Sequence, residues 1–244
     1  MFVSLKRQKV RALSCLERSF NGLGEGEVGM RIKIVVLGLF LFLIACQDQV
    51  HADSAQQVKQ KMTNPVVVFA TNHGDIAIEL YADRAPISTA NLLAYVESGF
   101  YTGIIFHRVI PGFMLQAGGF DAQLTRRGPL RPTIKNEADN GLSNVRGSVA
   151  MARSQQVDSA SSQFFINLVD NSRLDHRSKD SRGYGYAVVG KVIEGMDVAD
   201  KIASQPTLCP SSKRQRCEAN LPTGMRDVPA EAVIFNKVSL RKVK

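Results

Sequence analysis

The chain has 244 residues and a formal net charge of +9. Without its first 52 residues it keeps 192 (244 minus 52), enough for one domain with a sizeable core, and no internal repeat is evident. The charge of this part, +6 from 24 basic and 18 acidic residues, is spread along the chain and mainly favours solubility. Together with the export signal described next, it excludes nucleic acid as an expected partner.

The start of the chain has the pattern of a secretory signal. An unbroken apolar run at residues 34–44 follows Arg31 and Lys33, which is the length and charge order of an export signal and not of a membrane span. Met30 precedes this segment, so residues 1–29 are interpreted as an over-extended start.

Two processing sites are open. Residues 43–46 (Leu-Ile-Ala-Cys) fit a bacterial lipobox, which would place the signal at 30–45 and leave Cys46 lipidated as a membrane tether. Residues 50–52 (Val-His-Ala) fit ordinary cleavage, with the signal at 30–52. The protein is then either an envelope lipoprotein or a soluble periplasmic protein, with a linker over 53–64 and one domain over 65–244.

The predicted domain is dominated by short strands. Residues 66–71 and 75–80, separated by Asn-His-Gly, predict a hairpin. Six further apolar runs predict strands at residues 104–109, 113–116, 148–152, 164–167, 187–192 and 232–241, which gives eight.

Two helices are predicted among these strands. The first opens at Pro86 and stops at Gly99, with Ala90, Leu93 and Val96 at three-residue spacing and Leu92 alongside. The second spans about residues 196–203, with Val198 and Ile202 four positions apart.

The most informative stretch is residues 106–116, Phe-His-Arg-Val-Ile-Pro-Gly-Phe-Met-Leu-Gln. It sets one permanent cation, Arg108, among large apolar side chains, with the amide of Gln116 beyond them, a mixture that suits a pocket for a neutral, apolar group. Covalent, metal and nucleotide chemistry lack support, because the stretch has no nucleophile beside a base, no metal-ligand pair and no phosphate cradle.

This stretch resembles the cyclophilin signature, and the likeness covers roughly residues 65–244. It continues in order through residues 147–153 (Gly-Ser-Val-Ala-Met-Ala-Arg), 162–166 (Ser-Gln-Phe-Phe-Ile) and 190–192 (Gly-Lys-Val). Residues 136–141 and 195–200 resemble the bacterial periplasmic branch of that family. The resemblance implies a mainly β fold, a closed eight-stranded antiparallel β-barrel capped by two α-helices, in which closure protects the strand edges.

The resemblance implies peptidyl-prolyl cis-trans isomerase activity without a cofactor or a metal, assisting the folding of exported proteins. Rotation about an Xaa-Pro bond breaks no bond, so no nucleophile is needed, and Arg108 would donate to the prolyl nitrogen as the amide twists. The partners would be proline-containing unfolded or extended polypeptides, bound by a monomer. The alternative is a chaperone module that binds extended peptides and isomerises them only incidentally.

By the same likeness, nine further residues bind the substrate. They are Phe113, Met114, Gln116, Ala152, Arg153, Gln163, Phe165, Leu174 and Tyr186. Two positions depart from many members of the family, since Arg173 stands where they have tryptophan and Tyr186 where they have histidine. The first departure predicts weak inhibition by cyclosporin.

Other polar residues are interpreted as structural. His107 is expected to face away from Arg108, because neighbours on a strand point to opposite sides. The polar residues 136–139 are interpreted as turn chemistry, and Gly118 with Gly119 as a close approach of two backbones. Cys209 and Cys217 are the two cysteines after the signal and lie in one polar loop, so export predicts a disulfide between them.

Overall fold

The computed structural model describes residues 64–212, 221–222 and 225–241. These residues belong to one compact unit, residues 62–244. The predictions for residues 1–29, for the signal at 30–52 or 30–45, for Cys46, for most of the 53–64 linker and for Cys217 lie outside the described residues. In the described part of the chain, no helix has the length and apolar character needed to cross a membrane.

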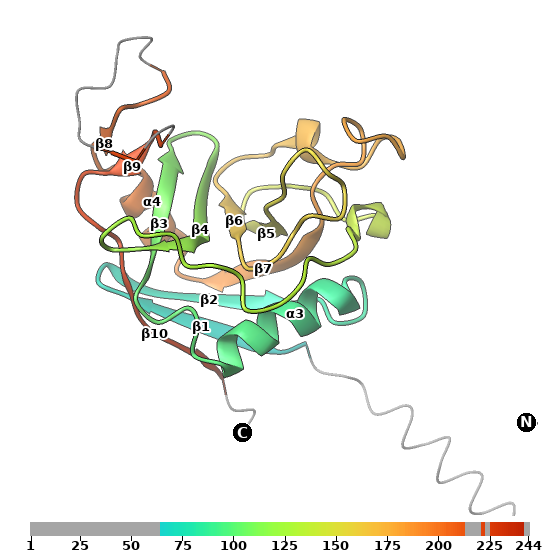
Figure 1. Ribbon diagram of the computed structural model, residues 1–244, viewed down its shortest axis with the longest axis horizontal. Coiled ribbons are helices and arrows are strands. Elements are labelled where there is room, and N and C mark those ends of the chain that lie inside the picture. Colours follow the sequence, from blue (N-terminus) through green and yellow to red (C-terminus); the bar gives the residue numbers. More distant parts are fainter. Residues whose placement is uncertain (1–63, 213–220, 223–224, 242–244) are drawn as a thin grey trace, which may run out of the picture. The chain divides into compact units, whose positions relative to one another are not determined.

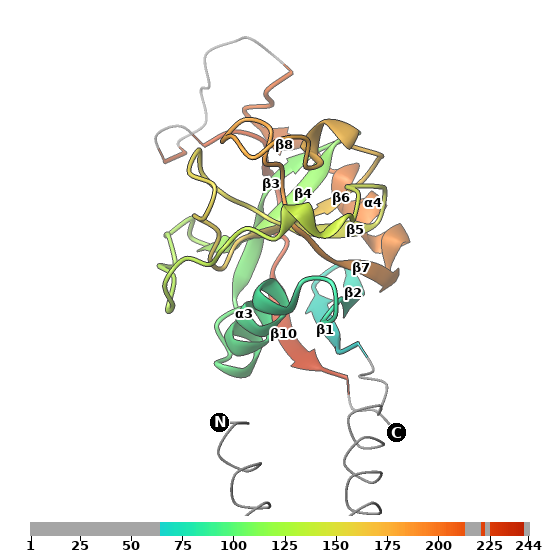
Figure 2. The same ribbon diagram turned by 90° about the vertical axis from the view of Figure 1, so that its right-hand side faces the viewer.

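Eight strands form a single antiparallel sheet that curves into a barrel (Figures 1 and 2). They are β1 (Val66–Thr71), β2 (Gly74–Leu80), β3 (Ile104–Ile110), β4 (Met114–Asp121), β5 (Ser148–Met151), β6 (Phe164–Asn167), β7 (Val188–Glu194) and β10 (Phe235–Leu240). Their order is β10-β1-β2-β7-β5-β6-β4-β3. An isolated bridge joins Ile105 of the outer strand β3 to Ile234, the residue before the other outer strand, β10, so the barrel is nearly closed. The predicted eight-stranded antiparallel architecture is confirmed.

A small second sheet was not predicted from the sequence. It pairs β8 (Thr207–Leu208) with β9 (Val228–Pro229). Strands of two residues carry no periodicity that a sequence pattern could reveal. The pair brings the segment before β10 alongside β3, where the Val109 N–H donates to the carbonyl of Asp227 at 2.8 Å.

Two α-helices, α3 (Pro86–Glu97) and α4 (Met196–Ala203), lie on different sides of the barrel (Figures 1 and 2). The predicted apolar face of α3 is partly wrong, since Ala90 is exposed and Leu93 only half-buried, whereas Leu92 and Tyr95 are buried with Val96. Apolar spacing misjudged the face because the aromatic Tyr95 packs on Phe100 and Tyr101. Two short 3-10 helices, η1 (Ala138–Asn140) and η2 (Ser172–Leu174), lie between α3 and α4 along the chain.

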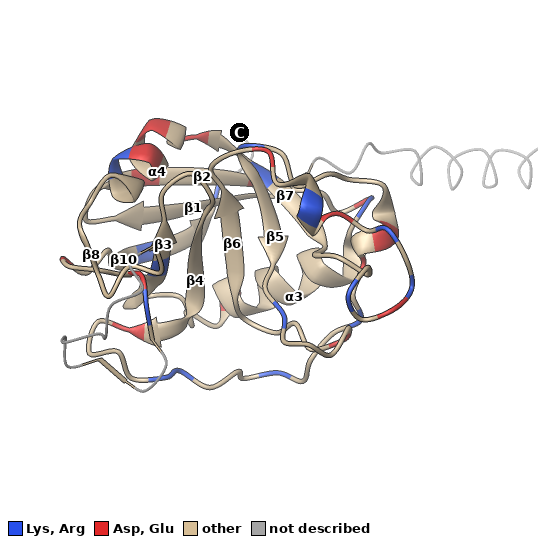
Figure 3. Ribbon diagram, turned by 90° about the horizontal axis from the view of Figure 1, so that it is seen from above, with Lys and Arg blue, Asp and Glu red and all other residues tan. Residues whose placement is uncertain are grey.

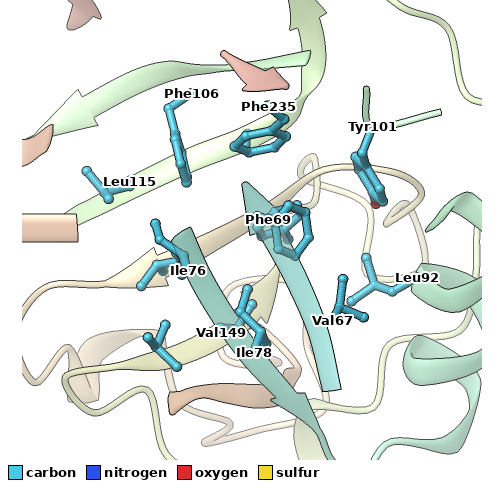
Figure 4. Packing of buried hydrophobic residues seen from close by; sticks show 14 of the residues in the cluster. Val67, Phe69, Ile76, Ile78, Leu92, Tyr101, Phe106, Leu115, Val149 and Phe235 are labelled. Carbon is cyan, nitrogen blue, oxygen red and sulfur yellow. The ribbon is translucent and has the colours of Figure 1, made fainter. Parts of the chain in front are cut away.

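The strand alternation separates two apolar clusters. The larger fills the barrel and contains Phe69, Phe106, Leu115, Phe164 and Phe235, several of which are shown in Figure 4. The smaller lies on the outer face of the same strands, around Met114, Ala150, Phe165 and Val188. One set of strands therefore supplies both the core and a second apolar surface.

The start of α3 depends on a residue far along the chain. Glu137 is buried, and its carboxylate accepts hydrogen bonds from the N–H groups of Ile87 (3.0 Å) and Ser88 (2.8 Å) and from the Ser88 hydroxyl (2.7 Å). These are N–H groups that a helix start leaves without an intrahelical partner, and a negative charge is favourable there. Glu137 therefore fixes α3 to the loop before β5, a larger role than the turn chemistry predicted for it.

We expect Glu137→Ala to lower the free energy of unfolding by about 2 to 4 kcal/mol, since charged hydrogen bonds to buried donors are lost together. Denaturant titration measures this loss. Glu97→Ala, at the exposed end of the same helix, is the matched control and should change the value by less than about 0.5 kcal/mol. Equal effects of the two substitutions would contradict the capping role.

Candidate active site

An extra residue in β3 sets the direction of Arg108. Phe106 pairs with Ala117 and Arg108 with Gln116, so two steps along β3 match one step along β4, and His107 is the bulged residue. In a regular strand Phe106 and Arg108 would share a face. The bulge instead leaves Phe106 and Val109 in the barrel core and places Arg108 on the outer face.

The predicted orientation of His107 is corrected by the same bulge. His107 and Arg108 do not point to opposite sides but line a common cavity. The rule of alternation fails here because the bulged residue breaks the two-residue period. His107 is nonetheless only 6% exposed and is absent from the lining of the apolar pocket described below.

Two glycines bring β4 close to the chain before β6. A Cβ atom on Gly118 would lie 2.3 Å from the Ser162 carbonyl oxygen, and one on Gly119 would meet the Gln163 side chain at 2.6 Å. The Ser162 hydroxyl also donates to the Gly118 carbonyl at 2.8 Å. The predicted close backbone approach is confirmed at Gly118, whereas the neighbour of Gly119 is the Gln163 side chain, which lies beside Gln116.

An apolar pocket of about 140 Å³ lies on the outer face of the barrel. Its lining consists of Arg108, Phe113, Met114, Gln116, Ala152, Arg153, Phe165, Leu174 and Tyr186. Of the ten residues predicted from the sequence as catalytic or substrate-binding, Gln163 alone is not in this lining. Gln163 lies directly behind it and accepts a 2.9 Å hydrogen bond from the Gln116 amide.

The pocket has an apolar floor and a cationic rim. Phe165 and Met114 are almost fully buried in the smaller apolar cluster, and Phe165 packs edge-on against Tyr186 at 5.6 Å between ring centres. Arg173, at the position predicted to weaken cyclosporin binding, lies 4.6 Å from the centre of the Phe113 ring. A cation over an aromatic face is attractive, so Arg173 stabilises this wall of the pocket.

Arg153 makes several contacts within the protein. Its guanidinium lies 4.9 Å from the centre of the Tyr186 ring and donates to the carbonyls of Gly185 (2.8 Å) and Ser181 (3.0 Å). These bonds hold the loop before β7 against the pocket. The position of Tyr186, which sequence reasoning could not fix because the loop is long, is set by this contact.

A second cavity, of about 360 Å³, also has Arg108 in its lining. Its lining includes His107, Phe120, Ser211 and Asp227. The Asp227 carboxylate is 3.8 Å from Arg108 Nε, and its side chain is 4% exposed. Sequence reasoning missed Asp227, because the two residues come together only through the pairing of β3 with the C-terminal segment.

Burial lowers the pKa of His107 from its usual 6.5 to about 4, and the neighbouring charge of Arg108 lowers it further in the same direction. Within the described residues its Nδ1 atom is buried without a hydrogen-bond partner. The imidazole is therefore neutral at pH 7, and Arg108 is the charged member of this pair of neighbours.

The predicted disulfide pair is only partly described. Cys209 is described, whereas its predicted disulfide partner, Cys217, is not.

Among the residues that the structure describes, no group of three or more His, Cys, Asp or Glu could hold a metal ion. Figure 3 shows Lys and Arg distributed over several loops, including the long connection between β4 and β5.

The barrel and its pocket define a site for an uncharged, apolar group beside a fixed cation. Residues 66–222 match the family model of the cyclophilin type peptidyl-prolyl cis-trans isomerases. The chain is similar to peptidyl-prolyl cis-trans isomerase A of Dickeya dadantii, with 52% identity over 59% of this chain and 74% of the relative. It is also similar to peptidyl-prolyl cis-trans isomerase B of Escherichia coli, with 46% identity over 72% of this chain and 99% of the relative.

The fold agrees with solved structures. Two crystal structures of a cyclophilin type isomerase from Cryptosporidium parvum, one in the presence of the dipeptide Ala-Pro, have TM-scores of 0.56 and 0.55. Their identities are 23% and 24%, and each covers about three quarters of this chain (74% and 73%) and 99% of its own. The chain belongs to the cyclophilin family and is a peptidyl-prolyl cis-trans isomerase.

Neighbours on β6 allow activity to be separated from stability. Phe164 lies in the barrel core and Phe165 in the pocket floor. We expect Phe165→Ala to reduce kcat/KM roughly tenfold. Losing about 1.4 kcal/mol of favourable apolar contact with the substrate corresponds to a tenfold change in kcat/KM. Phe164→Ala should instead cost about 3 to 5 kcal/mol of stability and leave turnover per folded molecule near wild type. A core substitution that abolished turnover of the folded fraction would contradict this division.

Stability should fall as the pH drops toward 4 because of His107. The folded-state pKa is about 4, below the unfolded value of 6.5, so between these values the unfolded chain binds a proton that the folded protein does not. The contribution is therefore complete above about pH 6.5 and is lost toward pH 4, in total about 3 kcal/mol.

The measurement is denaturant unfolding at several pH values for the wild type and for His107→Gln, which does not titrate. Carboxylates titrate in both proteins, so the difference between the two curves isolates the imidazole. Parallel curves between pH 7 and 4.5 would show that His107 has no depressed pKa.

Proposed function

We propose that this isomerase acts on Xaa-Pro bonds of exported polypeptides and that Arg108 is its catalytic residue. The observation that carries the proposal is that a half-exposed guanidinium and the apolar side chains of Phe113, Met114 and Phe165 line one pocket. The proline ring would occupy the apolar floor, where its burial displaces water. Its peptide nitrogen would then lie at the cationic rim.

The chemistry requires a donor and no base. The barrier of about 20 kcal/mol arises because the nitrogen lone pair is delocalised into the carbonyl. A twisted transition state localises this pair on nitrogen, so a donor there binds the transition state more strongly than the planar ground state. The Arg108 guanidinium fits this role, since it stays protonated at any ordinary pH and has five N–H donors in a rigid fork.

The peptide on either side of proline would be held with little sequence demand. Gln116, fixed by its hydrogen bond to Gln163 at 2.9 Å, would bind the backbone near the rotating bond. Ala152 directly follows β5 and would pair with the extended chain. Substrates are therefore proline-containing unfolded or extended polypeptides of broad sequence, bound by a monomer.

The proposed compartment rests on the sequence of residues 30–52. An export signal would place the enzyme in the bacterial periplasm, where a Cys209–Cys217 disulfide could form. Fatty-acid labelling of wild type and Cys46→Ala would separate the envelope lipoprotein, which incorporates label through Cys46, from the soluble protein, which does not.

The catalytic role is tested by Arg108→Ala. Loss of one charged hydrogen bond, about 1.5 to 3 kcal/mol, should slow isomerisation of an Xaa-Pro peptide by roughly 10- to 150-fold. Arg108→Lys keeps the charge without the fork, so its rate should lie between those of the wild type and Arg108→Ala. Arg146→Ala, which removes a surface arginine paired with Asp200, is the matched control and should turn over like the wild type.

A loss smaller than about threefold in Arg108→Ala would contradict the catalytic assignment. Because no proton is transferred, kcat/KM should also stay flat from about pH 6 to 8. In cells, the same variant distinguishes the isomerase from a peptide-binding chaperone, since a chaperone would keep its role without Arg108.

A further inference from the structure

The C-terminal segment of the domain is fixed to β3 beside Arg108. The Val109 N–H donates to the Asp227 carbonyl at 2.8 Å, and the Asp227 N–H donates to the Cys209 carbonyl at 3.3 Å. Asp227 has φ of 59°, a left-handed conformation that Asp tolerates better than most residues. Its backbone is therefore tied to both β3 and the chain after β8.

The Asp227 carboxylate is buried and anchored. The Ser211 N–H donates to Oδ1 at 2.5 Å, and the Ser211 hydroxyl donates to Oδ2. The side chain is 4% exposed, whereas that of Arg108 is 41% exposed. A carboxylate held on two sides by fixed donors is a stationary negative charge.

The carboxylate meets one edge of the guanidinium. Oδ2 is 3.8 Å from Arg108 Nε, which is an ion-pair distance and longer than a hydrogen bond. One N–H of a terminal nitrogen shares this edge with Nε–H, and the other three terminal N–H groups lie on the remaining edges of the planar fork. An anion at Nε therefore restrains the plane of the fork without occupying the donors at its tip.

Asp227 and Arg108 share the second cavity but not the apolar pocket. Asp227 lines the second cavity, whereas Arg108 lines both that cavity and the apolar pocket. The pocket lining does not include Asp227. Arg108 is therefore the pocket residue with which this carboxylate forms an ion pair.

We propose that Asp227 is a positioning residue that holds the Arg108 guanidinium over the apolar pocket. An arginine side chain with two fifths of its surface exposed has several rotamers open to it. The fixed anion selects one of them before substrate binds, so that catalysis does not require the side chain to be ordered in each turnover. This inference rests on the proposed role of Arg108.

The test is Asp227→Asn in the full chain, which keeps the shape and an acceptor for the Ser211 N–H and removes the charge. We expect kcat/KM for an Xaa-Pro peptide to fall roughly tenfold. The Kd of a proline-containing peptide, measured by NMR titration, should stay within about twofold, because the pocket floor is unchanged. In an Arg108→Ala background the same substitution should change the residual rate by less than about twofold.

Ser211→Ala is the matched control. It removes a hydrogen bond to the same carboxylate but keeps the charge, so it should lower stability and preserve most of the turnover. Wild-type turnover by Asp227→Asn would overturn the proposal. An equal loss of turnover on Asp227→Asn substitution with and without Arg108 would also overturn it, because a merely structural role of Asp227 predicts equal losses. If Arg108→Ala is impaired but Asp227→Asn has wild-type turnover, only the positioning role of Asp227 fails. If Arg108→Ala is as active as the wild type, the catalytic role proposed for Arg108 fails as well.

A measurement on the wild type covers the case in which Asp227→Asn does not fold. The Arg108 Nε–H signal in the ¹⁵N spectrum, assigned by its absence from Arg108→Lys, should have a high order parameter on the nanosecond timescale. A mobile side chain would overturn the proposal.

Discussion

The site depends on the one-residue bulge at His107. Strand periodicity would place Arg108 on the same face as Phe106, inside the barrel, where a guanidinium without a partner could not be accommodated. The extra residue moves Arg108 to the outer face and keeps Phe106 and Val109 in the core. A cation can therefore occupy a strand whose neighbouring residues are among the most buried in the protein.

The remainder of the pocket follows from regular alternation. On β6, Phe164 and Ile166 face the core and Phe165 faces the pocket, while Val149 and Ala150 divide in the same way on β5. The pocket floor is consequently built on strands that the barrel core already holds rigid. Such support positions a binding surface more accurately than loops would.

The charged groups around the pocket have separate functions. His107 is held neutral by burial, Arg153 binds carbonyls of the loop before β7, and Arg173 lies on the Phe113 ring. Arg108 has Asp227 at its Nε edge and lines the pocket. This arrangement is the one that the donor role proposed for Arg108 requires, because neither Arg153 nor Arg173 competes for its place beside the pocket floor.

The sequence by itself determined the eight barrel strands, the two α-helices, the family, and the nine residues that line the pocket, because these follow from local patterns of apolar alternation and from motifs that resemble the family's. It could not determine the bulge at His107, the buried face of α3, the contact of Glu137 with the start of α3, or the approach of Asp227 to Arg108. Strand register decides the first and the packing of Tyr95 on Phe100 and Tyr101 decides the second, whereas the last two join segments that are distant along the chain. Only the folded chain brings such segments together, so the tertiary structure alone decided how the predicted residues are held.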